Sequence, residues 1–408
     1  MYTNLQDPAL FSTGHPFDVY AYLRENDPVH WQEETDGAGY WALMKYDDIK
    51  TVELDSETFS NEPHVFIGDN NAIGDETHRS LIFSDAPRHT AHRSLMSKEF
   101  SVSRIRRARE GMEQLVDSII DQIIEKGEAD LVEDLAAKMA SFTIADLMGI
   151  DRYESLEMFE AAALLTRNVP FDEGPGLEAA LTIFRHAAKA WQDRAEKPHD
   201  DTLGRIAQAE IMGIPVDEIQ FQIDYSLLVS AGSDTSRNVV GTGMITLMEH
   251  PDARQELIEN PALLPRALEE ILRYIPPIRA MRRTATKDTE LSGTPIRKGQ
   301  KVVMYYGAAN RDPAVFENPD SFDIHRKVNP HMTFGGGIHQ CLGSHLARLS
   351  LTAMFSALLR RMPDMEAAGP VVWPELGEAP MVSGPEGLKI KFTPGERVVH
   401  RDVAPIFS

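Results

Sequence analysis

Cys341 is the only cysteine in this 408-residue chain, and its surroundings suggest chemistry. It lies in the segment TFGGGIHQCLGSHLARL, from Thr333 to Leu349, after three glycines and a histidine and before an apolar pattern with helical spacing. A thiol near the N-terminus of a helix meets unpaired N–H groups and the positive end of the helix dipole, which favour the thiolate. We therefore interpret Cys341 as a metal ligand or nucleophile, although a lone cysteine is most often a small buried apolar residue.

Several chemistries use a thiol beside a glycine-rich turn. A phosphate-binding loop needs the lysine and hydroxyl of GxxxxGK[ST], which this segment lacks. A cysteine nucleophile could use His345, four residues further on, as its base, but no neighbouring residue supplies the third, orienting group. A zinc site would require more cysteines or clustered histidines. A single thiolate ligand suits haem iron.

The stretch FGGGIHQCLG, from Phe334 to Gly343, matches the pattern F-x-x-G-x-x-x-C-x-G of the cytochrome P-450 superfamily at every fixed position. Further segments resemble the family's motifs in the same order: DAPRHTAHR (Asp85–Arg93), AGSDTS (Ala231–Ser236), EEILRY (Glu269–Tyr274) and ANRDPAVFENPDSFDIHR (Ala309–Arg326). The chain therefore resembles, over nearly its whole length, a haem-thiolate monooxygenase of the soluble bacterial type.

This resemblance implies a haem b cofactor, iron protoporphyrin IX, with Cys341 as the axial ligand of the iron. It also implies that cationic or hydrogen-bonding groups contact the two haem propionates. The residues that it assigns to the cofactor are His89, Arg93, Arg283, Phe334, Gly337, His339, Cys341 and Gly343. Arg282 is adjacent to Arg283 and is an alternative propionate contact.

Asp234 and Thr235 resemble the family's acid–alcohol pair, which relays protons to dioxygen, and we take them as the catalytic residues. The alternative is an ordinary polar face of an amphipathic helix. Polar side chains in the middle of a long helix are costly to bury unless they are paired, which favours the functional interpretation.

One motif departs from the family pattern. The tetrapeptide Pro319-Asp320-Ser321-Phe322 has Ser321 where the family often has an arginine that joins the Glu270–Arg273 pair. Either Arg326 takes that place or the network is smaller. Ala86 likewise replaces the first proline of D-P-P-x-H-x-x-x-R.

Helical periodicity dominates the chain, so we expect a mainly α fold with small β-sheets, formed by residues 1–408 as one domain. One helix from about Val216 to Glu249 would be roughly 50 Å long at ~1.5 Å per residue, with a kink near Gly232. The polar stretch Ser60–Ser84 is long enough to be a lid. Other helices are expected near Arg104–Lys126, Leu131–Met148, Leu177–Glu196 and Pro265–Tyr274, and strands near Tyr40, Leu291–Tyr306 and the GLKIKF segment.

An apolar small-molecule substrate is expected, because the residues predicted to surround it are mostly aliphatic. A terpenoid, a steroid-like molecule, a fatty molecule or an aromatic one would fit, and the sequence does not rank them. The predicted walls are Phe66, Ile67, Ile82 and Phe83, the region Leu164–Phe171, Leu227, Leu228 and Ala231, and Ile278, Met281, Met381 and Val382.

The formal net charge of −22 argues against partners such as nucleic acid or an anionic membrane. We expect the protein in the cytoplasm, because there is no signal segment and no apolar run of membrane-spanning length. We also expect it to be a monomer. No flavin or iron–sulfur segment occurs, so electrons from NAD(P)H should arrive through a separate ferredoxin or flavodoxin with its reductase. Cations that could attract this partner are Arg104, Arg106, Arg107, Arg109, Arg348, Arg360 and Arg361.

The reaction implied by the resemblance is monooxygenation, in which one atom of dioxygen enters a C–H bond. Desaturation, epoxidation or ring coupling within the same family is an alternative. A non-catalytic haem-thiolate sensor is a different class of protein, and the Asp234–Thr235 pair argues against it, since a sensor needs no proton delivery.

Overall fold

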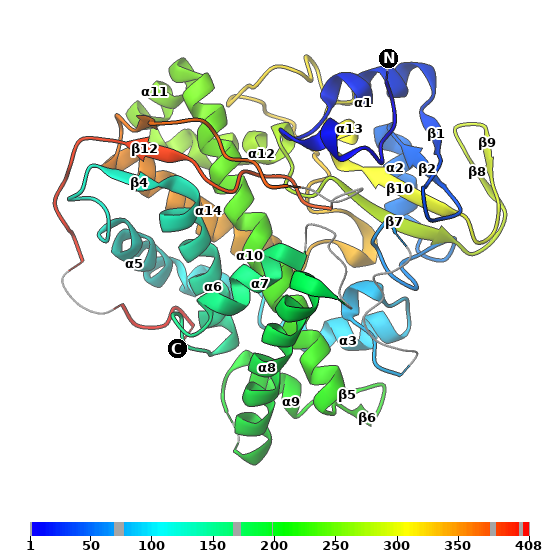
Figure 1. Ribbon diagram of the computed structural model, residues 1–408, viewed down its shortest axis with the longest axis horizontal. Helices are drawn as coiled ribbons and strands as arrows, with labels where there is room; N and C mark the ends of the chain where they lie inside the picture. Colours follow the sequence, from blue (N-terminus) through cyan, green and yellow to red (C-terminus); the bar gives the residue numbers. More distant parts are fainter. Residues whose placement is uncertain are drawn as a thin grey trace.

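Helices form most of the computed structural model, which describes residues 2–68, 77–165, 173–197, 199–375, 381–399 and 403–407 (Figure 1). The expectation of a mainly α fold with small β-sheets is confirmed. The α-helices are α1 (Phe17–Asn26), α2 (Tyr46–Leu54), α3 (Arg88–Ser97), α4 (Val102–Arg107), α5 (Arg109–Ile120), α6 (Lys138–Met148), α7 (Leu156–Leu165), α8 (Gly174–Glu196), α9 (Thr202–Ala207), α10 (Glu218–Glu249), α11 (Pro251–Glu259), α12 (Leu264–Tyr274), α13 (Tyr306–Ala309) and α14 (Ser344–Arg361). A π-helical turn, η3 (Leu131–Ala137), leads into α6, and short 3₁₀ turns are η1 (Pro8–Phe11), η2 (Leu81–Phe83), η4 (Pro261–Leu263) and η5 (Gly337–His339).

The largest sheet has five strands in the order β1-β2-β10-β7-β3, in which β2 and β10 are parallel and the other pairs are antiparallel. Its central strand, β10, is buried at every residue, as expected for the apolar run VVMY. The strands of the structure are β1 (Val29–Gln32), β2 (Tyr40–Leu43), β3 (Phe59–Ser60), β4 (Glu128–Asp130), β5 (Glu210–Ile211), β6 (Ile214–Pro215), β7 (Ala280–Ala285), β8 (Thr289–Leu291), β9 (Thr294–Ile296), β10 (Lys301–Tyr305), β11 (Glu366–Ala367) and β12 (Lys389–Lys391).

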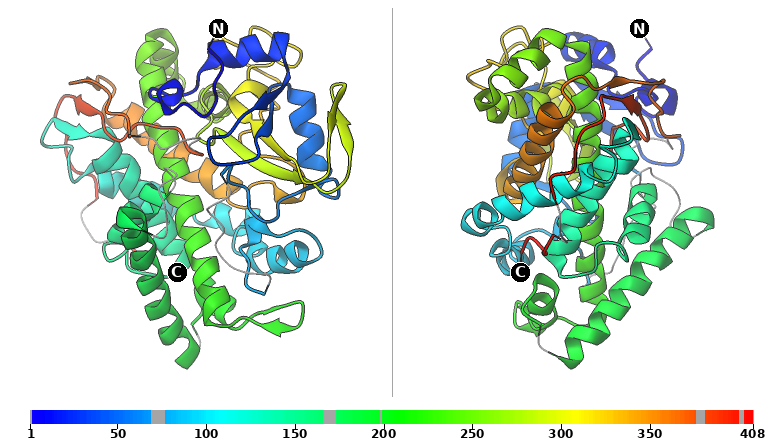
Figure 2. Two further views of the ribbon diagram at one scale, coloured as in Figure 1. Left: turned by 45° about the vertical axis from the view of Figure 1, so that its right-hand side comes forward. Right: turned by 90° about the vertical axis from the view of Figure 1, so that its left-hand side faces the viewer.

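Helix α10 is the long central helix that the sequence predicts, and it crosses the whole molecule (Figure 2). It begins after Asp217, whose carboxylate accepts a hydrogen bond from the N–H of Gln220 at 3.0 Å, and it ends where Pro251 cannot continue the helical hydrogen bonding. Its 32 residues are helical throughout, including Ala231–Ser236. α10 packs against α6, α7, α8 and α14, so its middle lies in the interior.

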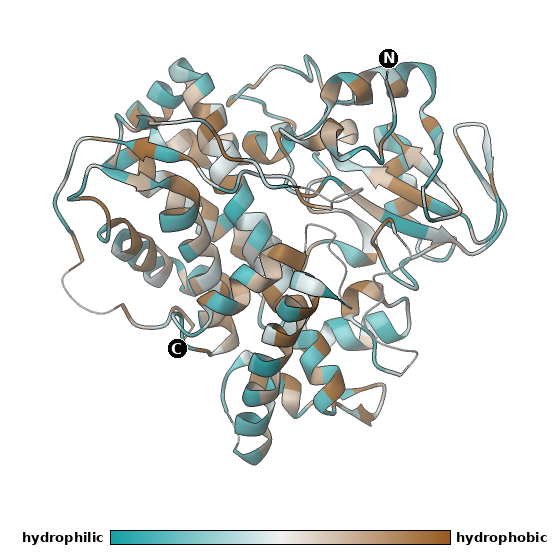
Figure 3. Cartoon of the chain, viewed as in Figure 1, coloured by the Kyte–Doolittle hydropathy of each residue, from teal (hydrophilic) through white to brown (hydrophobic). Residues whose placement is uncertain are grey.

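The other predicted helices are present, with differences in their bounds. The segment predicted as one helix from Arg104 is divided at Ala108 into α4 and α5, and α5 ends at Ile120. The main core is formed by helices, and the sheet has two smaller apolar clusters of its own. The outer faces of α3 and α8 are largely hydrophilic (Figure 3). Among the described residues, no helix combines the length and the apolar character needed to cross a bilayer.

Candidate active site

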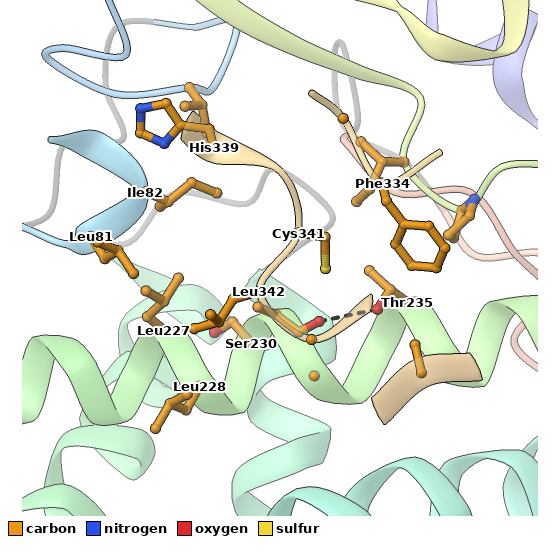
Figure 4. Close-up of a pocket in the computed structure, with 18 of the residues that line it drawn as sticks. Leu81, Ile82, Leu227, Leu228, Ser230, Thr235, Phe334, His339, Cys341 and Leu342 are labelled. Carbon is orange, nitrogen blue, oxygen red and sulfur yellow. Dashed lines mark hydrogen bonds between the residues drawn. The ribbon is translucent and has the colours of Figure 1, made fainter. Parts of the chain in front are cut away.

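A mainly apolar cavity lies between α10 and the loop that carries Cys341 (Figure 4). Cys341 and Thr235 both reach into it, from opposite sides. Further walls come from η2, from β7 and from residues 381–382. The structure therefore brings together a thiol, a helix hydroxyl and an enclosed apolar space, which segments far apart in the sequence supply.

The cysteine loop closes on itself ahead of α14. The N–H of Cys341 donates to the carbonyl of Phe334 at 2.8 Å, and Arg348 lies over the Phe334 ring at 4.4 Å. α14 begins at Ser344, so Cys341 precedes the helix by three residues instead of opening it. Burial raises the pKa of the Cys341 thiol, against the opposing effects of the Gly343 N–H, Arg93 and Arg348. Binding of a metal ion would displace the proton and give the thiolate.

The glycines of this loop serve packing against α2. Gly337 has φ +61°, and a Cβ at this position would lie 2.2 Å from the carbonyl oxygen of Glu53. Gly335 has φ +63°. Gly337 does not line the cavity, whereas Gly343 and Phe334 do. The close neighbour of Gly337 is thus the backbone of α2, and this contact explains why a glycine is needed at this position.

Two histidines in the cavity wall have ring nitrogens without a hydrogen-bond partner among the described residues. Neither ring nitrogen of His89 forms a hydrogen bond with a described residue, and the same holds for Nε2 of His339. The two rings lie 4.1 Å apart. Burial and the neighbouring cation Arg93 lower the pKa of His89 to about 4, and burial with His89, Arg283 and Arg93 lowers that of His339 to about 2. Neutral imidazoles and two arginines facing one cavity form a site for an anion.

These groups fit the propionates of a haem. Buried donors without partners are costly unless a ligand satisfies them, and carboxylates would do so. Arg93 and Arg283 line the cavity with the histidines, whereas Arg282 does not. The Nη1 of Arg282 instead approaches the carbonyl of Ile67 at 3.5 Å. The choice of Arg283 over Arg282 thus agrees with the geometry.

Asp234 and Thr235 lie on different sides of α10. Thr235 faces the cavity, and its hydroxyl donates to the carbonyl of Ala231 at 3.0 Å (Figure 4). Asp234 is buried, does not line the cavity, and forms an ion pair with Arg237 at 3.5 Å. A proton held by Asp234 would therefore have to pass around the helix to reach the cavity.

The Glu270–Arg273 pair is fully buried, with 2.7 Å between Oε1 and Nη2. Arg326 completes the network: its Nε donates to Oε2 of Glu270 at 3.0 Å. Arg273 also donates to the carbonyls of Asn310, Pro319 and Ser321. Arg326 thus takes the place that Ser321 leaves open, and the network anchors the chain that leads into the cysteine loop.

Most of the predicted pocket walls line the cavity. These are Phe66, Ile82, Phe83, Leu227, Leu228, Ala231, Ile278, Met281, Met381 and Val382. Ile67 was wrongly predicted: it packs into the core beside the large sheet. Leu165 lines the cavity, but residues 166–171 of the predicted region lie outside the described residues, as do residues 69–76 of the predicted lid.

Glu53 was not predicted as a site residue, but it is a carboxylate in the cavity wall that pairs with Arg283 at 3.1 Å. It lies in an ordinary amphipathic stretch, TVELDSETF, and no local pattern distinguishes it from a solvated glutamate. Its partner is 230 positions further on, so only the tertiary structure reveals the pair.

Comparison with known proteins identifies the family. The cytochrome P-450 family model matches residues 215–364. A steroid C26-monooxygenase of Rhodococcus jostii is 34% identical over 380 residues, covering 89% of this chain and 79% of that protein. A cytochrome P-450 of Mycobacterium marinum in complex with pseudoionone aligns with a TM-score of 0.88 and 29% identity, over 96% of this chain and 99% of the other. One of Bacillus megaterium in complex with testosterone aligns with a TM-score of 0.79 and 28% identity, over 93% and 98%.

The chain belongs to the cytochrome P-450 family, and it is a haem-dependent monooxygenase that acts on apolar molecules. The family uses dioxygen and electrons derived from NAD(P)H.

Proposed function

We propose that this enzyme hydroxylates a neutral steroid-like or terpenoid molecule, with haem b held over Cys341. One observation supports the proposal: Cys341, Thr235 and the four residues proposed to bind the propionates all line the same apolar cavity. His89, Arg93, Arg283 and His339 would hold the propionates. When bound, the haem supplies the activation of dioxygen and the transfer of one oxygen atom.

The protein's own groups would position the substrate and deliver protons. The Thr235 hydroxyl, held by the Ala231 carbonyl, would keep a proton-donating water at the cavity side of α10. Asp234, on the other side of the helix, would pass protons toward that hydroxyl when its pair with Arg237 opens. Leu227 and Leu228, on the turns before Thr235, would exclude bulk water.

The substrate class follows from the wall opposite the cysteine loop. This wall contains leucine, isoleucine, phenylalanine and methionine, while the charged lining residues Glu53, Arg93 and Arg283 lie around the proposed propionate site. The described polar residues of the lining outside the proposed propionate site are neutral, such as Ser226 and Ser230, so a charged substrate would find no ion-pair partner there and burying its charge would be costly. The relatives support a steroid-like or terpenoid substrate, since one is named a steroid C26-monooxygenase and others are complexed with testosterone or pseudoionone.

Electrons would come from NAD(P)H through a reductase and a separate ferredoxin or flavodoxin. Most of the predicted cationic surface is already neutralised: Arg104 pairs with Glu99, Arg348 with Glu269, and Arg360 and Arg361 with Asp117. Arg106 and Arg107 on α4 are exposed and form no ion pair with a described residue. These two residues are therefore the proposed contact for an acidic redox partner.

The test is a screen for ligands that shift the haem from low to high spin, followed by turnover with NADPH and a surrogate ferredoxin and reductase. Neutral steroids and terpenoids should give the shift and a hydroxylated product. Free fatty acids of similar length should bind more weakly, because their carboxylate must be desolvated. Ligand binding without any oxygenated product from any bound ligand would favour the sensor function instead.

A further inference from the structure

Glu53, at the end of α2, is a buried carboxylate in the wall of the cofactor cavity. Its side chain is 1% exposed. Among the described residues that line the cavity, it is the only aspartate or glutamate. A buried carboxylate is strongly destabilising unless it is paired and hydrogen-bonded, so its partners define its role.

Two groups from distant segments satisfy this carboxylate. Nη2 of Arg283, on β7, lies 3.1 Å from Oε2. The hydroxyl of Tyr306, on α13, donates to Oε1. Burial and Glu53 raise the pKa of Tyr306 well above its usual value, so this hydroxyl remains a donor. The backbone carbonyl of Glu53 lies against Gly337, which joins the cysteine loop to the same cluster.

The pairing leaves Arg283 able to bind another anion. A guanidinium has five N–H donors, and here Nη2 contacts Glu53 while Nη1 donates to the carbonyl of Arg282 at 3.0 Å. Because both contacts hold the planar group in one orientation within the wall, its remaining donors are available to a second carboxylate at little further cost in side-chain entropy.

We infer that Glu53 is a positioning residue for the cofactor: it holds Arg283 for a haem propionate and places a carboxylate beside the haem. The inference rests on the proposed function, since it requires haem in this cavity. Reduction of the iron adds an electron, and a nearby negative charge in a region of low dielectric constant opposes that step. Glu53 therefore lowers the reduction potential of the haem iron.

The test is a spectroelectrochemical titration of the purified haem protein and three variants. Glu53→Gln keeps the shape but removes the charge, and it should shift the potential to more positive values. Tyr306→Phe removes the donor that partly neutralises the carboxylate, so it should shift the potential to more negative values. Glu57→Gln, a change of the same chemistry at an exposed position of the same segment, should leave the potential unchanged.

Opposite shifts from Glu53→Gln and Tyr306→Phe support the inference, because loss of structure would move both potentials in the same direction. A Glu53→Gln potential equal to that of Glu57→Gln overturns it, even if thermal stability falls. If Glu53→Gln does not retain haem, the Tyr306→Phe shift decides, and a positive or absent shift overturns the inference. The carbon-monoxide spectrum of the unaltered protein tests the proposed function separately.

Discussion

Thr235 and Asp234 are adjacent in the chain but face different environments, one in the cavity and the other beside Arg237. A helix turns by about 100° per residue, so two neighbouring side chains can face different surroundings. The Thr235 hydroxyl would therefore hold water in the cavity. Asp234, on the far side of α10, would release protons when its ion pair with Arg237 opens. This division assigns a separate function to each residue.

Thr235→Ala should uncouple the enzyme. Haem content, the carbon-monoxide spectrum and the substrate-induced spin shift should persist, because the residue only supplies a hydroxyl at the cavity wall. Product formed per NADPH consumed should fall by about tenfold or more. Tenfold is a minimum, because a positioned proton donor usually contributes more than that to the rate. Hydrogen peroxide should account for the difference, as measured alongside NADPH oxidation.

The matched control is Ser236→Ala, which removes a hydroxyl from the next residue in the cavity lining. It should leave coupling close to that of the unaltered enzyme. Fully coupled turnover by Thr235→Ala would remove Thr235 from the proton route and leave it a structural residue of α10.

Single residues were predictable where a contiguous motif surrounds them. Cys341, His89, Arg93 and Thr235 all lie in such motifs, and all four line the cavity. Glu53 was not predictable, because its function depends on a partner from another part of the chain. Ile67 was misassigned because an irregular segment has no periodicity to show which side chains face inward.

At the scale of elements, the Glu270–Arg273–Arg326 network ties α12 to the segment that precedes the cysteine loop. Glu270 also accepts from the N–H of Asp323 at 2.9 Å and from Asn329 at 3.1 Å. The long helices were predicted, but not all of their ends: the segment from Arg104 is divided at Ala108, and α5 ends at Ile120. Arg326 was named from the sequence as one of two possibilities, and the structure confirms it. The sequence could not decide between Arg326 and a smaller network, since that depends on how the irregular chain from 310 to 334 folds back on α12.

Arg326→Ala should lower the free energy of unfolding by about 1.5–3 kcal/mol, the usual value of a hydrogen bond to a charged group. Glu270 would keep Arg273 but lose a partner in a site where its own side chain is fully buried. Chemical denaturation of the haem-bound protein measures the loss. The control is Arg297→Ala, since the Arg297–Asp288 pair is mostly exposed and an exposed ion pair contributes little to stability. Equal losses in the two variants would show that Arg326 does not support the fold.

At the scale of the whole molecule, the charge of −22 repels acidic partners except where cations remain unpaired. The sequence predicted a patch of seven arginines, but most of them pair with aspartate or glutamate once the helices pack. Only the folded arrangement shows which positive charges are neutralised. Arg106 and Arg107, which are exposed on α4, are thus the two predicted residues that we still propose as contacts for an acidic redox partner.

Reversing both charges, Arg106→Glu with Arg107→Glu, should slow reduction by an acidic ferredoxin at low salt and leave substrate affinity unchanged. The difference from the unaltered enzyme should shrink as salt rises, because exposed charges are screened over ~10 Å at 0.1 M. Stopped-flow reduction measures the rate. The control with the same total charge change is Arg297→Glu with Lys298→Glu, in the turn after β9, on the other side of the molecule from α5 (Figure 1). A similar slowing in both double variants would indicate a general charge effect and no specific contact.

The central claim, that Cys341 holds haem iron as a thiolate in this cavity, is tested most directly by the carbon-monoxide spectrum of the freshly purified, reduced protein. We expect the strongly red-shifted Soret band of thiolate-ligated haem, and we expect Cys341→Ser to abolish this band even where haem remains bound. A spectrum typical of histidine-ligated haem in the unaltered protein, or an unchanged red-shifted band in Cys341→Ser, would contradict the assignment.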